Sequence, residues 1–127
     1  MRLFLVRHAE AAPGEPDDLR PLTSAGRDAA REVGARLAAE RPDAVLSSPL
    51  LRARETAAAI ATAARLELEA YERLAPGATA DVVRSAAAGR GETVVAVGHQ
   101  PDCSEIVLEL TGREVRFAPG AFHEVVL

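Results

Sequence analysis

The sequence contains no tryptophan and no lysine, and only 3% of its 127 residues are aromatic. Hydrophobic residues still make up 48% of the chain, so a core must be built mainly from Ala, Val, Leu and Ile. This size and composition are typical of one globular domain, which we expect to span residues 1–127. Because lysine is absent, all 15 cationic side chains are arginines, and an arginine is informative here only through its position.

Other absences exclude whole classes of protein. The only cysteine is Cys103, so an internal disulfide is impossible. The apolar run in residues 1–6 is too short for a signal peptide or a membrane span. The net charge is −4, with acids and bases interleaved and no basic stretch suited to nucleic acid or to a lipid surface. We therefore expect a cytoplasmic protein that binds neither nucleic acid nor membrane.

Apolar runs alternate with helical patterns along the chain, which predicts an α/β fold with a mainly parallel sheet. Strands are expected at residues 3–6, 44–46, 66–71, 93–97 and 122–127, the last of them antiparallel at an edge. One helix is expected between Thr23 as its cap and Pro42, and another after Ser48 as cap and Pro49 in the first position. Two more are expected at residues 81–88 and 101–110, while residues 9–20 are expected to form a loop.

Polar groups follow three of these expected strands. The first strand ends in Arg7 and His8, the second leads into Arg52, and the central one leads into His99. In an open α/β sheet, ligands bind at the carboxyl ends of the strands. If the three strands are parallel neighbours, their ends meet, and two arginines and two histidines face one small volume.

This combination of side chains favours a phosphate group over a metal ion. Two guanidinium groups present fixed donors to a dianion, and Arg52 falls in the first turn of an expected helix, where backbone N–H groups attract anions. Arginines would repel a cation, and carboxylates are not placed among the histidines. A histidine between arginines is pushed towards its neutral form, whose lone pair can attack phosphorus. Which histidine attacks does not follow from these considerations alone.

Four segments resemble the histidine phosphatase superfamily, also called phosphoglycerate mutase-like. Arg7–Glu10 (RHAE) resembles the Arg-His-Gly motif, and Leu22–Gly26 (LTSAG) is similar to Leu-Thr-x-x-Gly. Ser48–Ala57 (SPLLRARETA) matches Ser-x-Leu-x-Arg-Ala-x-x-Thr-Ala, and Val97–Pro101 (VGHQP) contains the Gly-His motif. The resemblance implies a three-layer sandwich with helices on both faces of the sheet, and it needs no metal and no organic cofactor.

The resemblance also implies roles for individual residues. His8 would be phosphorylated during the reaction, and Arg7, Arg52 and His99 would hold the phosphoryl group, with Glu10 as a further substrate-binding residue. Water would then hydrolyse the phosphohistidine intermediate. The general acid is not evident: Glu72 is the candidate by its position, and Glu10, Asp17 and Asp18 are alternatives. Ala9 replaces the usual glycine, which places a methyl group beside His8.

The chain is short, and in this respect it resembles the SixA-type bacterial phosphohistidine phosphatases. The segment between Arg52 and His99 is brief, so we expect an open site that suits a phosphorylated protein, such as a phosphotransfer domain, as substrate. The alternatives are a phosphatase acting on a small phosphorylated metabolite and a phosphate-binding module without turnover, with a mutase less favoured. Outside these segments, Cys103 and His123 are expected to be structural.

Overall fold

Five strands form one sheet in the order β3-β2-β4-β1-β5. The computed structural model describes residues 1–127. Strands β1 to β4 run parallel, while β5 pairs antiparallel with β1 at the edge of the sheet, as expected. Their bounds are β1 Arg2–Arg7, β2 Ala44–Ser47, β3 Leu68–Ala70, β4 Thr93–Gly98 and β5 Phe122–Val126.

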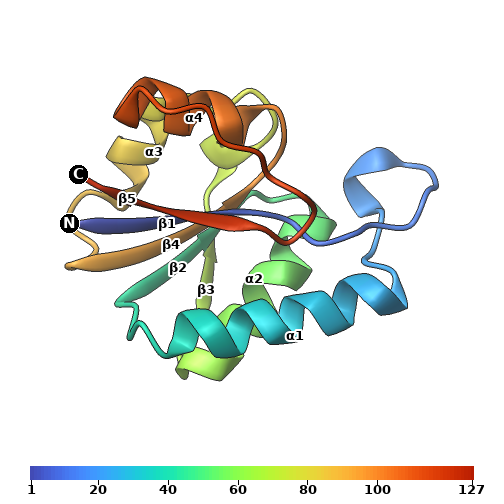
Figure 1. Ribbon diagram of the computed structural model, residues 1–127. Helices are drawn as coiled ribbons and strands as arrows, with labels where there is room; N and C mark the ends of the chain where they lie inside the picture. The colour runs from blue at the N-terminus through green and yellow to red at the C-terminus, as the bar shows by residue number, and fades with distance from the viewer.

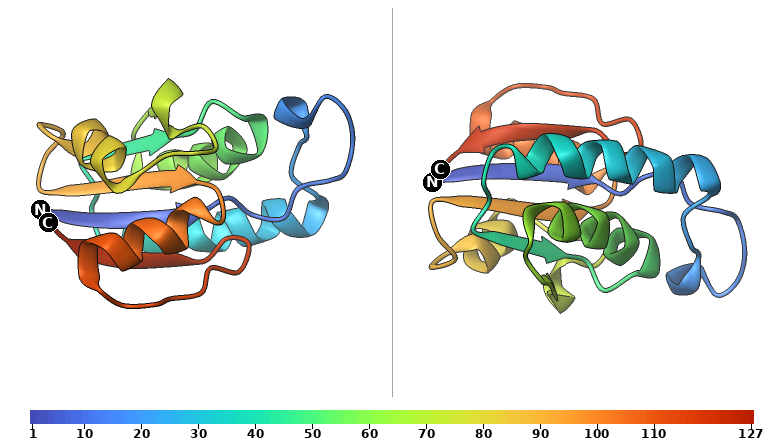
Figure 2. Two further views of the ribbon diagram at one scale, coloured as in Figure 1. Left: turned by 90° about the horizontal axis from the view of Figure 1, so that it is seen from above. Right: turned by 90° about the horizontal axis from the view of Figure 1, so that it is seen from below.

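Helices cover both faces of the sheet. Helices α1 (Ser24–Ala38) and α2 (Leu51–Ala64) lie on one face, and α3 (Ala80–Ala87) and α4 (Asp102–Thr111) lie on the other (Figure 1 and Figure 2). Two short 3-10 helices, η1 (Asp17–Leu19) and η2 (Glu72–Leu74), occur in the connections. The predicted three-layer α/β fold with a mainly parallel sheet is therefore confirmed.

The core consists of two apolar layers, one on each side of the sheet. Successive residues of β1 alternate between them: Leu3 and Leu5 pack with α3 and α4, whereas Phe4 and Val6 pack with α1 and α2. Val94 to Val97 of β4 alternate in the same way. Strands buried on both faces read as unbroken apolar runs, which explains why these two strands were evident in the sequence.

Helices α3 and α4 lie within one residue of their predicted bounds, whereas two other helix boundaries differ by more. Helix α1 ends at Ala38 rather than reaching Pro42, and Arg41 has a positive φ of 52°. A turn at residues 39–40 follows the helix, and the left-handed conformation of Arg41 leads the chain into Pro42.

The predicted start of α2 is also wrong. The helix begins at Leu51, and its cap is Leu50 in an extended conformation, with no capping side chain. Ser48 is therefore not the helix cap, and Pro49 is not its first residue. The Ser48 hydroxyl instead accepts a hydrogen bond from the Leu50 amide and faces His99, which keeps residues 48–50 out of the helix.

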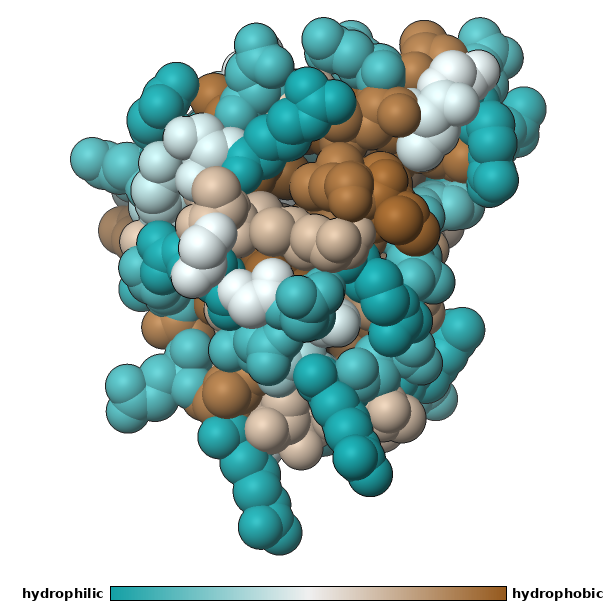
Figure 3. All heavy atoms as spheres, turned by 90° about the vertical axis from the view of Figure 1, so that its left-hand side faces the viewer, coloured by the Kyte–Doolittle hydropathy of each residue, from teal (hydrophilic) through white to brown (hydrophobic).

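The two ends of the chain meet at the amino ends of the parallel strands. Met1 and Leu127 exchange backbone hydrogen bonds of 3.2 and 2.8 Å. Figure 3 views this end of the molecule and shows apolar side chains gathered on part of it, among hydrophilic ones. Val126 is exposed, and it lies next to the end of the chain. No helix has the length and apolar character needed to cross a bilayer.

Candidate active site

The side chains singled out in the sequence lie at the carboxyl ends of three neighbouring strands. Strand β4 lies between β1 and β2, so the ends of these three strands are adjacent. His8 follows β1 and His99 follows β4, and the two residues therefore lie next to each other. The His8 amide donates to the Gly98 carbonyl at 3.0 Å, and the Ser48 amide donates to the Val97 carbonyl at 3.0 Å. The two imidazole rings lie 5.2 Å apart, centroid to centroid, at an interplanar angle of 59°. The expected meeting of these strand ends is therefore found.

The hydrogen bonding of His8 fixes its tautomer. Its Nδ1 atom lies 2.7 Å from the Ala9 carbonyl oxygen, which can only accept, so Nδ1 carries the proton. The Nε2 lone pair is therefore available. Burial is the main cause that lowers the pKa of His8, and the charges of Arg52, Arg7 and Arg20 lower it further against the Ala9 hydrogen bond. The ring is accordingly neutral at pH 7.

His99 is almost completely buried and is held by Ser48. Its Nε2 atom lies 2.7 Å from the Ser48 hydroxyl oxygen. Because that hydroxyl already accepts from the Leu50 amide, its own proton is free to donate to Nε2. Burial, followed by the charges of His8 and Arg52, lowers the pKa of His99 to about 4. Both imidazoles at this site are therefore neutral near pH 7.

Arg7 carries a buried donor that has no acceptor. Its NH1 group donates to the Phe117 carbonyl at 2.9 Å, which holds the guanidinium in one orientation, and its charge acts on His8. Its Nε–H is buried and has no hydrogen-bond partner. An unpaired buried donor costs about 1–3 kcal/mol, so this atom marks a position where an acceptor is favoured.

Arg52 lies in the first turn of α2 and is paired with Asp17 in the first loop. Its NH1 group donates to the Asp17 carbonyl at 2.8 Å, and its NH2 group lies 3.2 Å from the carboxylate Oδ2. The other carboxylate oxygen accepts from Arg20 NH1 at 2.9 Å. Arg52 is 7% exposed, so the loop and η1 close one side of the site over its guanidinium.

Thr56 connects the end of β1 to α2. It is fully buried, and its hydroxyl accepts from the Ala9 amide at 3.0 Å and donates to the Arg52 carbonyl at 2.9 Å. The methyl group of Ala9 is buried and packs with Leu22 and Ala30. The substitution of glycine by alanine at this position therefore fills a small apolar cluster beneath α1 rather than the space between the imidazoles.

The candidate acidic residues lie in different surroundings. Glu10 is exposed, and its carboxylate accepts from the Thr23 hydroxyl at 2.7 Å, beside the start of α1. Glu72 is exposed in η2, just beyond the end of β3. The hydrogen bond from Arg20, aided by Arg52, lowers the pKa of Asp17, which makes that carboxyl group a poor proton donor at neutral pH. Asp18 is exposed in η1.

Three features of the site were not identified in the sequence. These are the pairing of Asp17 with Arg52, the presence of Arg20 beside it, and the contact of Ser48 with His99. The partners in the first and third contacts are separated by 35 and 51 residues, so no local pattern could reveal them. Only the LTSAG segment, which directly follows Arg20 and Pro21, indicated that this stretch belongs near the site.

The remaining reactive side chains lie outside this arrangement. Burial raises the pKa of the Cys103 thiol to about 12, and that residue packs in the core. The His123 ring packs against Phe117, and its Nε2 atom lies 3.1 Å from the Arg116 carbonyl oxygen. No group of three or more His, Cys, Asp and Glu side chains is placed to hold a metal ion.

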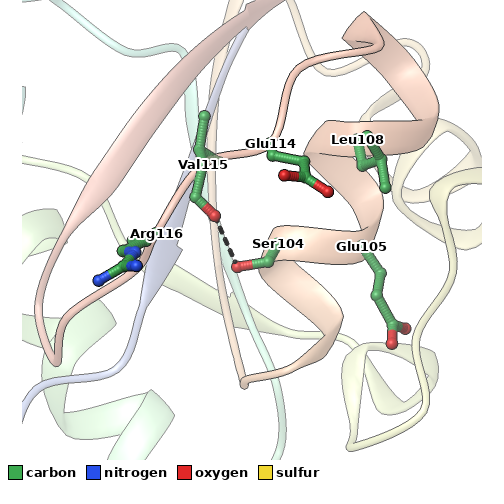
Figure 4. A pocket seen from close by; sticks show the side chains of 6 residues that line it. All are labelled: Ser104, Glu105, Leu108, Glu114, Val115 and Arg116. Atoms are coloured by element: carbon green, nitrogen blue, oxygen red, sulfur yellow. Dashed lines mark hydrogen bonds between the residues drawn. The ribbon is translucent and has the colours of Figure 1, made fainter.

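An open groove of about 400 Å³ lies between α4 and residues 114–116 (Figure 4). The Ser104 hydroxyl donates to the Val115 carbonyl at 3.1 Å and so fixes the two sides of the groove. Ser104 is also bonded to the side chain of Gln100, the neighbour of His99. Glu105 and Glu114 give the groove exposed carboxylates.

Comparisons with known proteins agree with this arrangement. The family model described as histidine phosphatase superfamily (branch 1) matches residues 3–76. An uncharacterized protein of Picosynechococcus sp. (strain PCC 7002) is 36% identical over 118 residues, which cover 83% of this chain and 70% of that protein.

Solved structures extend the likeness to the whole chain. The protein histidine phosphatase SixA complexed with tungstate is 28% identical, with a TM-score of 0.88, and the match covers 100% of this chain and 88% of SixA. A candidate phosphohistidine phosphatase SixA from Agrobacterium tumefaciens is 32% identical, with a TM-score of 0.75, and the match covers 88% of this chain and 77% of that one.

Proposed function

Because the chain belongs to the histidine phosphatase superfamily (branch 1), we propose that it is a phosphatase that hydrolyses phosphohistidine on proteins through a phosphoryl intermediate on His8. One observation carries this proposal: two neutral imidazoles, with ring centroids 5.2 Å apart, lie where Arg7 and Arg52 bring their guanidinium groups. The likeness to SixA structures supports the choice of a protein phosphohistidine as substrate.

His8 is assigned as the nucleophile because its Nδ1–H is held by the Ala9 carbonyl and its Nε2 lone pair is available. In the first step, Nε2 attacks phosphorus, the P–N bond to the substrate imidazole breaks, and the leaving nitrogen takes up a proton. In the second step, water attacks the phosphorus of phospho-His8, which releases inorganic phosphate and regenerates His8. Each step transfers the phosphoryl group without any change in oxidation state.

Arg7, Arg52 and His99 are assigned to hold the phosphoryl oxygens. A phosphoryl oxygen near Arg7 would supply the acceptor that its buried Nε–H lacks. Arg52 brings its guanidinium together with the first turn of α2, where backbone N–H groups also attract an anion. His99 is neutral, and with the Ser48 proton on its Nε2 it keeps the Nδ1–H as a donor. Such donors stabilise charge that develops on the transferring group.

Glu72 is the proposed general acid, and the proposed substrate reduces the need for one. The imidazole nitrogen of a phosphohistidine is a better leaving group than an alkoxide, so it requires less proton transfer in the transition state. Glu72 is exposed in η2, beyond the end of β3, where it can reach a leaving group that stands above the sheet. Glu10 remains a proposed substrate-binding residue on the opposite side of the strand ends.

The protein's partner is proposed to be a phosphorylated protein such as a phosphotransfer domain. Residues 1–127 are proposed to work as one domain in the cytoplasm, with no metal and no organic cofactor. A small phosphorylated metabolite is the alternative substrate.

A substrate comparison tests the proposal. The purified chain is given a phosphohistidine peptide and, separately, small phosphate esters, and inorganic phosphate release is measured for each. We expect a higher kcat/KM for the phosphohistidine peptide, and a higher value for the esters would overturn the choice of substrate.

Trapping the intermediate tests the chemistry. Wild type, quenched in base after brief exposure to radiolabelled substrate, should carry one acid-labile phosphoryl group, and His8→Ala should carry none. His123→Ala on β5 serves as the histidine control and should be labelled like wild type. If the wild type never labels and His8→Ala binds tungstate equally well, the chain is a binding module rather than an enzyme.

A further inference from the structure

Arg20 shares a carboxylate with Arg52 at the edge of the site. Asp17 Oδ1 accepts from Arg20 NH1 at 2.9 Å, while Asp17 Oδ2 lies 3.2 Å from Arg52 NH2. One carboxylate therefore joins two guanidinium groups, with one oxygen for each. The same residue's backbone carbonyl accepts from Arg52 NH1 at 2.8 Å, so Asp17 is fixed to Arg52 through two atoms.

The Arg20 side chain is held in place from both sides. Its Nε–H donates to the Ala12 carbonyl at 2.8 Å, and its NH1 group is held by Asp17. These contacts use two of its five N–H groups and leave NH2 unpaired, on a side chain that is 28% exposed. A guanidinium that is oriented by the protein and still has unpaired donors is suited to bind an oxyanion.

We propose that Arg20 is a third arginine of the phosphoryl-binding site and that Asp17 is the positioning residue that sets Arg20 and Arg52 side by side. This inference rests on the proposed function, because the ligand of Arg20 would be the phosphoryl group attacked by His8. The charge of Arg20 acts on His8, together with those of Arg52 and Arg7, which agrees with a place beside the nucleophile.

The carboxylate of Asp17 also accounts for how three arginines can lie together. Without it, Arg20 and Arg52 would repel each other, and each would keep only its contact to a backbone carbonyl, that of Ala12 for Arg20 and that of Asp17 for Arg52. With it, the two arginines and the carboxylate together carry a net charge of about +1, and each guanidinium is held by one carboxylate oxygen. Asp17 therefore acts on the substrate only through the arginines that it orients.

The chain contains a matched control pair. Arg31 and Asp28 on the outer face of α1 form an ion pair with the same spacing of three residues as Arg20 and Asp17, and both side chains are exposed. Asp28→Asn and Arg31→Ala thus remove the same chemical groups from exposed side chains that pair only with each other. Neither change should alter tungstate binding or turnover.

The experiment combines binding, steady-state kinetics and a pH profile. Arg20→Ala should weaken tungstate binding by about tenfold, the loss expected for one charge-assisted hydrogen bond, and should raise KM for a phosphohistidine peptide. Arg20→Lys should recover only part of this loss, because lysine keeps the charge but not the planar fork. Asp17→Asn should lower kcat/KM and weaken tungstate binding by a smaller factor.

The pH profile gives a readout that a purely structural role would not move. The charged groups around the two imidazoles are Arg7, Arg20, Arg52 and Asp17. Loss of the Arg20 cation should move the acid limb of kcat/KM to higher pH, because that cation lowers the pKa of His8. Loss of the Asp17 anion should move it to lower pH, because the charges of Arg20 and Arg52 would then act on His8 without the carboxylate that neutralises part of them.

The outcomes separate this inference from the proposed function. If the wild type binds tungstate and is phosphorylated on His8 while Arg20→Ala binds tungstate as tightly as Arg31→Ala, the assignment of Arg20 is wrong and the proposed function stands. If Asp17→Asn leaves both kcat/KM and the acid limb unchanged, its positioning role is wrong. If the wild type neither labels nor hydrolyses the peptide, the proposed function itself fails.

Discussion

The hydroxyl oxygen of Ser48 lies 2.7 Å from Nε2 of His99, and both residues are buried. This contact joins the segment after β2 to the segment after β4, across 51 residues of chain. It orients the imidazole, and a proton donated by the hydroxyl to Nε2 leaves the ring proton on Nδ1. The serine that resembles a helix cap in the sequence thus serves the proposed site instead.

Replacing Ser48 with alanine should impair turnover more than stability. The change removes the partner of His99 Nε2 and frees the ring to adopt the other tautomer, so we expect kcat to fall about tenfold, the effect of about 1.4 kcal/mol. Ser47→Ala is the control, since Ser47 is equally buried but its hydroxyl donates to the Ser48 carbonyl. Equal kcat in the two variants would contradict the assigned role.

The stability of the protein should decrease as pH falls from about 6.5 towards 4, in part because of His99. Its pKa is about 4 in the folded protein and about 6.5 when unfolded, so the unfolded chain binds more protons between these values. The stabilisation is therefore complete above pH 6.5 and is lost as pH falls. The Tm of His99→Gln should drop less between pH 7.5 and 4.5 than that of wild type, whereas His123→Gln should follow wild type.

Cys103 should not react with thiol reagents in the native protein. Its side chain is 1% exposed, and burial raises its pKa to about 12, so almost no thiolate is present at pH 8. We expect no labelling by iodoacetamide over hours in buffer and complete labelling in urea. Labelling in buffer faster than the measured rate of global unfolding would show that the core opens around α4.

Gly26→Ala should destabilise the fold strongly. A Cβ atom at this position would lie 2.1 Å from the Glu10 carbonyl oxygen, so the loop after His8 could no longer pack against α1. We expect the free energy of unfolding to fall by about 3 kcal/mol, the upper part of the range for overpacking. Ala25→Gly, exposed in the same turn, should cost only about 1 kcal/mol through helix propensity. A denaturant titration of both variants checks this difference.

The fold could be predicted from the sequence where a strand is buried on both faces and therefore reads as an unbroken apolar run. The run from Thr93 to Val97 predicts the central strand because both faces of β4 are covered. The strand Leu68–Ala70 is shorter than the predicted 66–71, since Leu66 and the exposed Glu67 continue the alternating pattern before the paired residues begin. Strand order is set by packing between distant segments, and it was inferred only by assuming that the polar strand ends meet.

The site could be predicted from the sequence for those residues that directly follow a buried strand. His8 and His99 each come after the end of a buried parallel strand, so the rule on carboxyl ends identified both. The contacts that hold them come from elsewhere: Asp17 reaches Arg52 from a loop, and its low pKa depends mainly on Arg20. From the sequence, Asp17 was only one of several acidic residues considered as the general acid. Its pairing with two arginines makes it unsuitable for that role.

The strand that carries the proposed nucleophile is made well before either of the strands with which it pairs. Strand β1 has only two neighbours in the sheet, β4 and β5, and both lie in the last third of the chain. During synthesis, β1 leaves the ribosome long before residue 93 exists and has no partner for its backbone hydrogen bonds until then. Its backbone therefore stays unpaired until residues 93–126 have been made, and the cluster around His8 forms only after that point.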